Sequence, residues 1–270
     1  MRGLILSISV LLLAQISLFA QANNPGDILP DRPDQTESPD ILQPGFVQIE
    51  GGYTYTHIKY IPDDFIKFTF SVNEVGTLIR IGIFPSAELR IEPEYQSIKS
   101  TISFQNPVFD YRNEVSGFIP LRLGTKIKIT DEDKYIPATA FLFKASIPEI
   151  ASNDFQDELS TAEFRVALSK TLSERFSLGV NLGAEYGTYS NSTSGLYTMS
   201  FSGEIYKQLG GFIELYGYFS EGYEPNHFID GGLTYRILNN LQVDLSAGTQ
   251  YSDDVSDFFI GGGLSVRLPR

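Results

Sequence analysis

The C-terminal stretch FIDGGLTYRILNNLQVDLSAGTQYSDDVSDFFIGGGLSVRLPR, residues 228–270, decides the fold class of this chain. Its central run, LQVDLSAG at 241–248, alternates strictly between apolar residues and polar or small ones. A period of two is the pattern of a β-strand and not of a helix. The runs on either side, residues 230–236 and 258–267, alternate in the same way. The stretch therefore predicts three consecutive antiparallel strands with no helix between them.

The connections between the predicted strands differ in length. A tight turn at 238–240 contains two asparagines, which tolerate the left-handed backbone conformation, whereas the next connection is a long acidic loop at 252–257. The same alternation of short turns and long polar loops continues through the chain, and residues 96–117 are expected to form one of the long loops. We predict about 12 strands in a single antiparallel up-and-down transmembrane β-barrel of the all-β class, with short periplasmic turns and longer extracellular loops.

Composition agrees with one large β domain. The 270 residues include no Cys, no Trp, 24 Gly, 15 Tyr and 20 Phe. Without cysteine there is no disulfide framework and no thiolate metal site. A formal net charge of −13 argues against nucleic acid as a partner, because phosphate backbones select basic surfaces. We predict no cofactor, no metal site and no catalytic residue.

The first 22 residues have the organisation of a signal peptide. Arg2 supplies a positive start, residues 4–19 an apolar core, and Ala20-Gln21-Ala22 a cleavage site. The alternative is an uncleaved anchor helix. A cleaved signal peptide predicts export to the outer membrane of a Gram-negative bacterium, with the barrel-assembly machinery and outer-membrane lipid as partners.

Residues 23–44 form a Pro-rich acidic N-terminal segment before the barrel, which we place at 45–270. The segment has no usable periodicity. Composition favours a disordered periplasmic tail. The alternative is that the segment folds into the lumen and partly plugs it. The candidate plug residues are Asp31, Arg32, Asp34, Thr36, Glu37 and Ser38.

One face of the predicted strands carries charged residues in mid-strand, and the opposite face is apolar and rich in Tyr and Phe. A membrane barrel requires this distribution, although alternation alone also fits a secreted soluble barrel or sandwich. The charges form either a structural network of ion pairs or a polar constriction that selects small solutes. The predicted lumen-lining residues are Glu50, Arg80, Glu88, Arg90, Glu92, Arg122, Lys126, Glu163, Arg165, Glu185, Glu214, Asp230, Arg236, Asp244 and Arg267.

The sequence contains little that would support an enzyme. A Ser-His hydrolase needs a positioned histidine as base, and the two histidines, His57 and His227, lie at predicted strand ends. Neither a G-x-S-x-G, an H-E-x-x-H nor a phosphate-binding loop is present, and the glycine run at 261–263 is better explained by close packing within a strand. We predict that the protein is not an enzyme, with a membrane-embedded hydrolase as the weakest alternative.

Several motifs also resemble a known family. They are DRPDQTESP at 31–39, GFVQIE at 45–50, LIRIG at 78–82, ELR at 88–90 and DGGLTY at 230–235. Together they resemble the bacterial outer-membrane transporter family of the MetA pathway of phenol degradation, across the whole mature chain. The resemblance implies an outer-membrane β-barrel that transports small solutes, including aromatic or hydrophobic compounds. The ending Leu-Pro-Arg at 268–270 departs from such barrels because it lacks a terminal aromatic residue.

Because the resemblance singles out the segment before the first strand, we favour the plug over the tail. Its carboxylates are then expected to meet inward Arg80, Arg90 or Arg122, and Arg32 to meet an inward glutamate. The preferred function is an outer-membrane channel or transporter for small solutes. A structural or adhesive barrel without transport is the main alternative.

Overall fold

The computed structural model describes residues 26–62, 65–105, 108–156, 160–187, 193–251 and 255–269. The predicted signal peptide, residues 1–22, lies outside the described residues. The strands are β1 (Val47–Tyr60), β2 (Ile66–Phe84), β3 (Ala87–Glu92), β4 (Glu94–Gln105), β5 (Val108–Phe118), β6 (Leu121–Thr130), β7 (Ala138–Ile147), β8 (Ala162–Thr171), β9 (Phe176–Tyr186), β10 (Thr193–Tyr206), β11 (Leu209–Ser220), β12 (Asn226–Leu238), β13 (Leu241–Tyr251) and β14 (Val255–Leu268). Two short 3-10 helices, η1 (Pro148–Ile150) and η2 (Asn153–Phe155), lie between β7 and β8.

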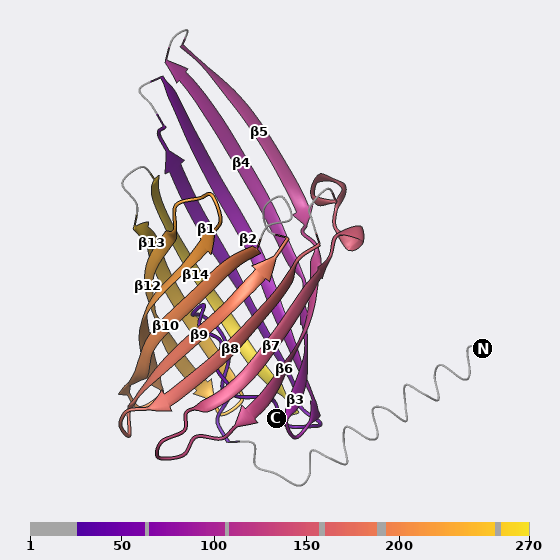
Figure 1. Cartoon of the computed structure of the whole chain (residues 1–270), viewed down its shortest axis with the longest axis vertical. Helices are drawn as coiled ribbons and strands as arrows, with labels where there is room; N and C mark the ends of the chain where they lie inside the picture. The colour runs from indigo at the N-terminus through magenta and orange to yellow at the C-terminus, as the bar shows by residue number, and fades with distance from the viewer. Residues whose placement is uncertain are drawn as a thin grey trace, which may run out of the picture.

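Twelve strands form a closed antiparallel barrel (Figure 1), as predicted. The ring closes because β1 pairs with β14 on one edge and with β2 on the other. The hairpin of β4 and β5 branches from this ring, since β4 continues β3 beyond Pro93 and pairs with the upper part of β2. Proline has no backbone N–H to donate to a neighbouring strand, which explains why the strand is interrupted there.

The two rims of the barrel differ as the connection lengths predicted. Short turns gather at one rim, where the C-terminus also lies, and this rim is the periplasmic one in barrels of this type. The turn at 238–240 does not use the left-handed conformation that we expected of its asparagines. Among the described non-glycine residues only Lys207, in the β10–β11 turn, has a positive φ, of 51°.

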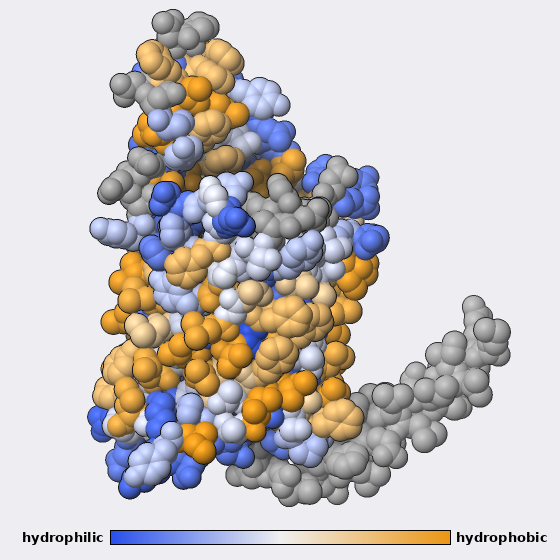
Figure 2. Space-filling view, in the orientation of Figure 1, coloured by the Kyte–Doolittle hydropathy of each residue, from blue (hydrophilic) through white to orange (hydrophobic). Residues whose placement is uncertain are grey.

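The outside of the barrel is apolar, as contact with lipid requires. Leu245 is 64% exposed and Ile213 is 63% exposed, and Figure 2 shows an apolar band across the visible face of the barrel with hydrophilic residues below it. Single residues of this kind are common on soluble proteins, but a continuous exposed band of this size marks an interaction surface. Among the described residues, no helix is long and apolar enough to cross a membrane.

The expectation of a long loop at 96–117 was wrong. This region consists mainly of β4 and β5, which rise above the rim together with the upper parts of β1 and β2 (Figure 1). The alternation of residues in fact continues through the region, but the apolar positions change to the other face of the sheet. Serine and charged residues on the outer face gave the sequence the composition of a loop.

Candidate channel lumen

The N-terminal segment runs inside the lower half of the barrel. It is attached at the periplasmic rim, where the Ile28 backbone N–H donates to the carbonyl of Asn239 at 2.7 Å. Arg267 of β14 donates to the carbonyls of Gly26 and Asp27, and Arg236 pairs with the Asp27 carboxylate at 2.6 Å. The segment is therefore bonded to the wall before its polar residues begin.

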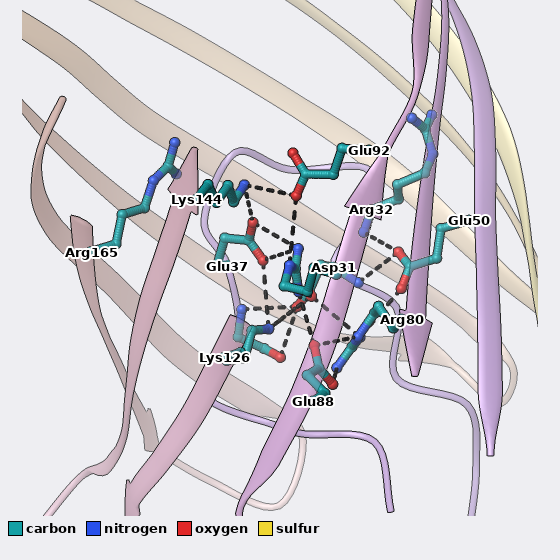
Figure 3. Close-up of polar contacts among 12 residues, drawn as sticks. Asp31, Arg32, Glu37, Glu50, Arg80, Glu88, Glu92, Lys126, Lys144 and Arg165 are labelled. Carbon is teal, nitrogen blue, oxygen red and sulfur yellow. Dashed lines mark hydrogen bonds and ion pairs between the residues drawn. The ribbon is translucent and has the colours of Figure 1, made fainter. Parts of the chain in front are cut away.

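Asp31 is the centre of a buried ion-pair cluster (Figure 3). Its carboxylate lies 2.6 Å from Arg90, 2.8 Å from Lys126 and 3.3 Å from Arg80. Its own backbone N–H donates to the Glu50 carboxylate at 2.9 Å. The pKa of Asp31 is lowered, because Arg80 and Lys126 together outweigh the effect of burial, which alone would raise it.

Glu37 forms the second anchor. It accepts two hydrogen bonds from the Arg90 guanidinium, at 2.9 and 2.8 Å, and lies 2.9 Å from Lys144. The Glu37 backbone is held as well, because Asn181 on β9 accepts from its N–H at 2.8 Å and donates to its carbonyl at 2.9 Å. Burial would raise the pKa of Glu37, but the cations Arg90 and Lys144 lower it well below its usual range.

Arg32 occupies a notch made by two glycines. Gly52 on β1 pairs with Gly263 on β14, and a Cβ built on Gly52 would lie only 2.2 Å from the Arg32 guanidinium. The guanidinium donates to Asp244 on β13 at 3.1 Å. Glycine is required at these two positions so that the arginine can lie directly against the wall, and this accounts for the end of the glycine run at 261–263.

Asp34 meets other acids instead of cations. Burial and the neighbouring carboxylates of Glu214 and Asp230 raise the pKa of Asp34 well above its usual range. The residues around it are tightly held, since the Gln35 N–H donates to Glu214 at 2.7 Å and the Thr36 hydroxyl lies 2.7 Å from that of Thr198. The segment thus has two sides, one facing cations and the other facing acids.

The remaining wall charges pair with one another. Arg80 bonds Glu88 at 2.9 Å and Glu50 at 3.2 Å, and Arg165 pairs with Glu163. Arg122 pairs with Glu92 at 3.5 Å and with Glu94 at 3.4 Å. Glu185 lies on the inward face of β9, opposite Glu163 on β8, and Asp230 lies on the inward face of β12, opposite Glu214 on β11.

Asp34 was expected to meet a cation, and this was wrong because it lies beside acids. Arg32 meets a glutamate only through its backbone N–H, which donates to Glu50 at 3.1 Å, whereas its guanidinium pairs with the aspartate Asp244. Of the three cations offered as partners of the segment, Arg122 instead has its ion pairs with β3 and β4. The prediction also missed Asn181 and Gln48, which are 0% and 1% exposed. Both alternate in phase with the inward charges, so the same periodicity could have identified them.

Two of the cavities that border the segment lie on opposite sides of residues 32–37. The cavity towards the periplasm has a volume of about 320 Å³ and includes Ser177 and Thr234 in its lining, and the cavity towards the outside has about 210 Å³ and includes Glu74 and Glu94. Residues that line both cavities are Arg32, Asp34 and Glu37. The segment is therefore the partition between them.

Among the described residues that face the lumen there is no histidine. His57 and His227 lie on the outward faces of β1 and β12, and the ring nitrogen of His227 contacts the Tyr197 hydroxyl at 3.0 Å. Within the described ranges, no group of three or more His, Cys, Asp or Glu side chains is arranged to hold a metal ion.

The fold is similar to several solved outer-membrane barrels. The COG4313 outer membrane channel from Pseudomonas putida F1 superposes with a TM-score of 0.55 at 12% identity, covering 91% of this chain and 99% of that one. The transport unit of the autotransporter AIDA-I from Escherichia coli gives 0.52 at 13% identity, covering 93% and 96%. The translocator domain of NalP from Neisseria meningitidis gives 0.50 at 9% identity, covering 96% and 95%. At these identities the likeness shows the fold alone.

No curated protein matches the sequence. A family model does match, over residues 30–268, and this range includes the DRPDQTESP motif and all of the barrel strands. Fold and family together place the protein in the outer membrane. The resemblance seen in the sequence is thereby confirmed: the chain belongs to the family described as "Putative MetA-pathway of phenol degradation".

Proposed function

We propose that the protein is an outer-membrane channel for small solutes, including aromatic or hydrophobic compounds, and that residues 23–44 act as its plug. The observation that carries this proposal is the pair of cavities separated by Arg32, Asp34 and Glu37. A solute that crosses the barrel must pass these residues. Displacing the side chains of a short segment needs a far smaller change than opening the hydrogen-bonded barrel wall.

The charged network supports a plug that is held firmly and placed uniquely. Asp31 and Glu37 are 7% exposed, and cations from β2, β3, β6 and β7 converge on them. A loose tail would not bury these carboxylates, because an unpaired buried charge is costly. A purely structural or adhesive barrel would have no use for open cavities on both sides of such a segment.

We also propose that the protein has no enzymatic activity, that residues 1–22 are a cleaved signal peptide, and that the barrel-assembly machinery inserts the mature chain. Edman sequencing of the mature protein would test the cleavage, with Asn23 expected as the first residue. Replacement of both histidines should leave any hydrolysis of lipid or peptide by the purified protein at background. A loss of measurable hydrolysis in that variant would contradict the non-enzyme proposal.

The channel itself is tested in planar bilayers. Refolded mature protein should give single-channel conductance, and deletion of residues 23–40 should raise that conductance and lower thermal stability while the barrel still inserts. Heat-modifiable migration on gels is the control for a folded barrel. Unchanged conductance in the deletion variant, together with free protease cleavage of the segment in the intact protein, would show that the segment is a tail.

A further inference from the structure

The sheet that rises above the rim has an inner and an outer face that can be assigned from the strand register. We call it the extension: the upper parts of β1 and β2 together with β4 and β5. Arg80 on β2 is 1% exposed inside the barrel, so the even-numbered residues of β2 face inward. The pairings of β2 with β1 and with β4 continue without a register shift to the tip. The same parity therefore holds along the whole extension.

The polarity of the wall reverses where the extension begins. On the outer face, Tyr53, Val75 and Tyr95 form one of the last apolar rows, and above them the positions are polar, as with Lys99 paired to Glu114 at 3.3 Å. On the inner face the change is opposite. Glu74 and Gln96 are hydrogen-bonded in the last row that carries a charge. Nearer the tip the inner positions are mainly apolar, with Phe68, Phe70, Ile98, Ile102 and Phe104 beside the uncharged polar residues Thr56, Ser100 and Asn113.

This inner face is not lipid-facing and is not a packed core. Tyr111 is 58% exposed and Phe109 is 49% exposed. Phe109 stacks on Phe104 with ring centroids 4.5 Å apart and an interplanar angle of 13°, which presents flat aromatic surface. Among the described inner positions above Glu74, none is charged. Exposed apolar surface of this kind marks a binding site.

Aromatic residues also line the upper lumen. Tyr216 on β11 is paired with Phe228 on β12, and both share the inward face of Glu214 and Asp230. Their rings stack at 4.8 Å with an interplanar angle of 7°, and Tyr218 meets Phe228 edge-on at 6.3 Å. From the extension towards the periplasm, the apolar inner face is therefore followed by the aromatic residues of the upper lumen and then by the charged residues around the N-terminal segment.

We propose that the inner face of the extension is a capture surface for small uncharged aromatic compounds, which it delivers to the lumen mouth. Delivery rests on the proposed channel function, whereas binding does not. The face has flat rings and no charge, which favours uncharged planar molecules over ions. A second copy in the same membrane would approach from outside the barrel and meet the polar outer face. The inner face is turned towards the axis of its own barrel.

Fluorescence can test the binding, because the chain contains no Trp. Tyr111→Trp places a single indole on the inner face, and Arg112→Trp places one on the outer face one residue away. In nanodiscs, bromobenzene should quench Tyr111→Trp saturably and much more than Arg112→Trp, whereas the anion 4-bromobenzoate should quench neither strongly. Adding Ile102→Asn, opposite Tyr111, should weaken the bromobenzene effect several-fold. Equal quenching of the two variants would refute the proposal. A dimer in size-exclusion chromatography that Tyr111→Asp abolishes would also refute it, because the inner face would then be a contact between two copies of the chain.

Uptake measurements separate this proposal from the channel function. Liposomes with the wild-type protein should take up phenol, and Ile102→Asn should slow uptake at low phenol concentration while leaving ion conductance unchanged. Quenching without uptake would leave the capture surface standing and refute the channel. Uptake without saturable quenching at Tyr111→Trp would refute the capture surface and leave the channel standing.

Discussion

The carboxylate of Asp31 and the ammonium of Lys126 lie 2.8 Å apart inside the barrel, although 95 positions separate them in the chain. Lys126 is 0% exposed, and its second ion-pair partner, Glu37 at 3.5 Å, also belongs to the N-terminal segment. Both carboxylates that pair with this lysine in the described structure therefore come from outside the barrel strands. The segment and the wall form one electrostatic unit, and removal of the segment leaves Lys126 without its two ion-pair partners, with Glu88 opposite it on β3 as the neighbouring wall carboxylate.

The destabilising effect of Lys126→Met should accordingly be much smaller when the segment is removed. In the intact protein, the substitution breaks a buried ion-pair cluster and should cost about 3 to 5 kcal/mol. In the variant lacking residues 23–40, Lys126 has lost both ion-pair partners and keeps only the attraction of Glu88, its cross-strand neighbour, so the same substitution should cost far less. Thermal unfolding followed by heat-modifiable gel migration measures both effects. The same destabilisation in both backgrounds would mean that Lys126 does not depend on the segment.

The glycine notch makes a second prediction with a close control. Gly52→Ala places a methyl group at the position of the Arg32 guanidinium and should displace it, because the end of a flexible side chain moves more easily than the barrel wall. We expect higher conductance and faster protease cleavage within residues 26–44. Gly76→Ala is the control, since Gly76 pairs directly with Gly52 but a Cβ there meets nothing within 4 Å. If both variants behave like wild type, Arg32 does not help to close the lumen.

The twelve-stranded barrel was predictable because period-two alternation and connection lengths are local properties of the sequence. The inward charges were predictable for the same reason, since Arg80 and Glu88 are inward by parity alone. Which charges meet was not predictable, because Asp31 and Lys126 come together only through the path of the segment in the lumen. The order of the strands does not determine that path.

The extension was missed for a different reason. In β2 the apolar residues occupy mainly odd positions from Ile83 at the periplasmic end to Val75, and even positions from Val72 to Ile66 at the tip of the extension. No bulge marks the change. A change of phase inside a strand resembles the end of the strand when only the sequence is read. Here the strand continues and the phase changes because the strand leaves the membrane, where lipid no longer requires an apolar outer face.

The lipid-facing assignment predicts unequal tolerance of arginine. Leu245→Arg, in mid-strand on the apolar band, should cost about 2 to 4 kcal/mol if it lies near the bilayer centre. Ser116→Arg should cost little, because Ser116 is exposed on the outer face of β5, above the apolar row. Urea unfolding in lipid vesicles compares the two. Equal costs would mean that the outer face of the extension is not in water or that Leu245 is not in lipid.

The acidic side of the segment gives a prediction whose sign depends on pH. Burial and Glu214 raise the pKa of Asp34, so its charged form opposes docking of the segment. This penalty is absent below the ordinary pKa of aspartate, about 3.9, and grows as the pH rises through the raised pKa. Asp34→Asn should therefore stabilise the docked segment at pH 8 and have little effect at pH 4. Glu37→Gln should do the opposite and destabilise the docked segment at pH 8. The pKa of Glu37 is lowered, so its charged form favours docking above the ordinary pKa of glutamate. This contribution is lost as the pH falls through the lowered pKa. Protection of the segment from protease, compared with wild type at each pH, measures both effects. Destabilisation by Asp34→Asn at pH 8 would show that Asp34 is held as a partner of the wall and does not repel it.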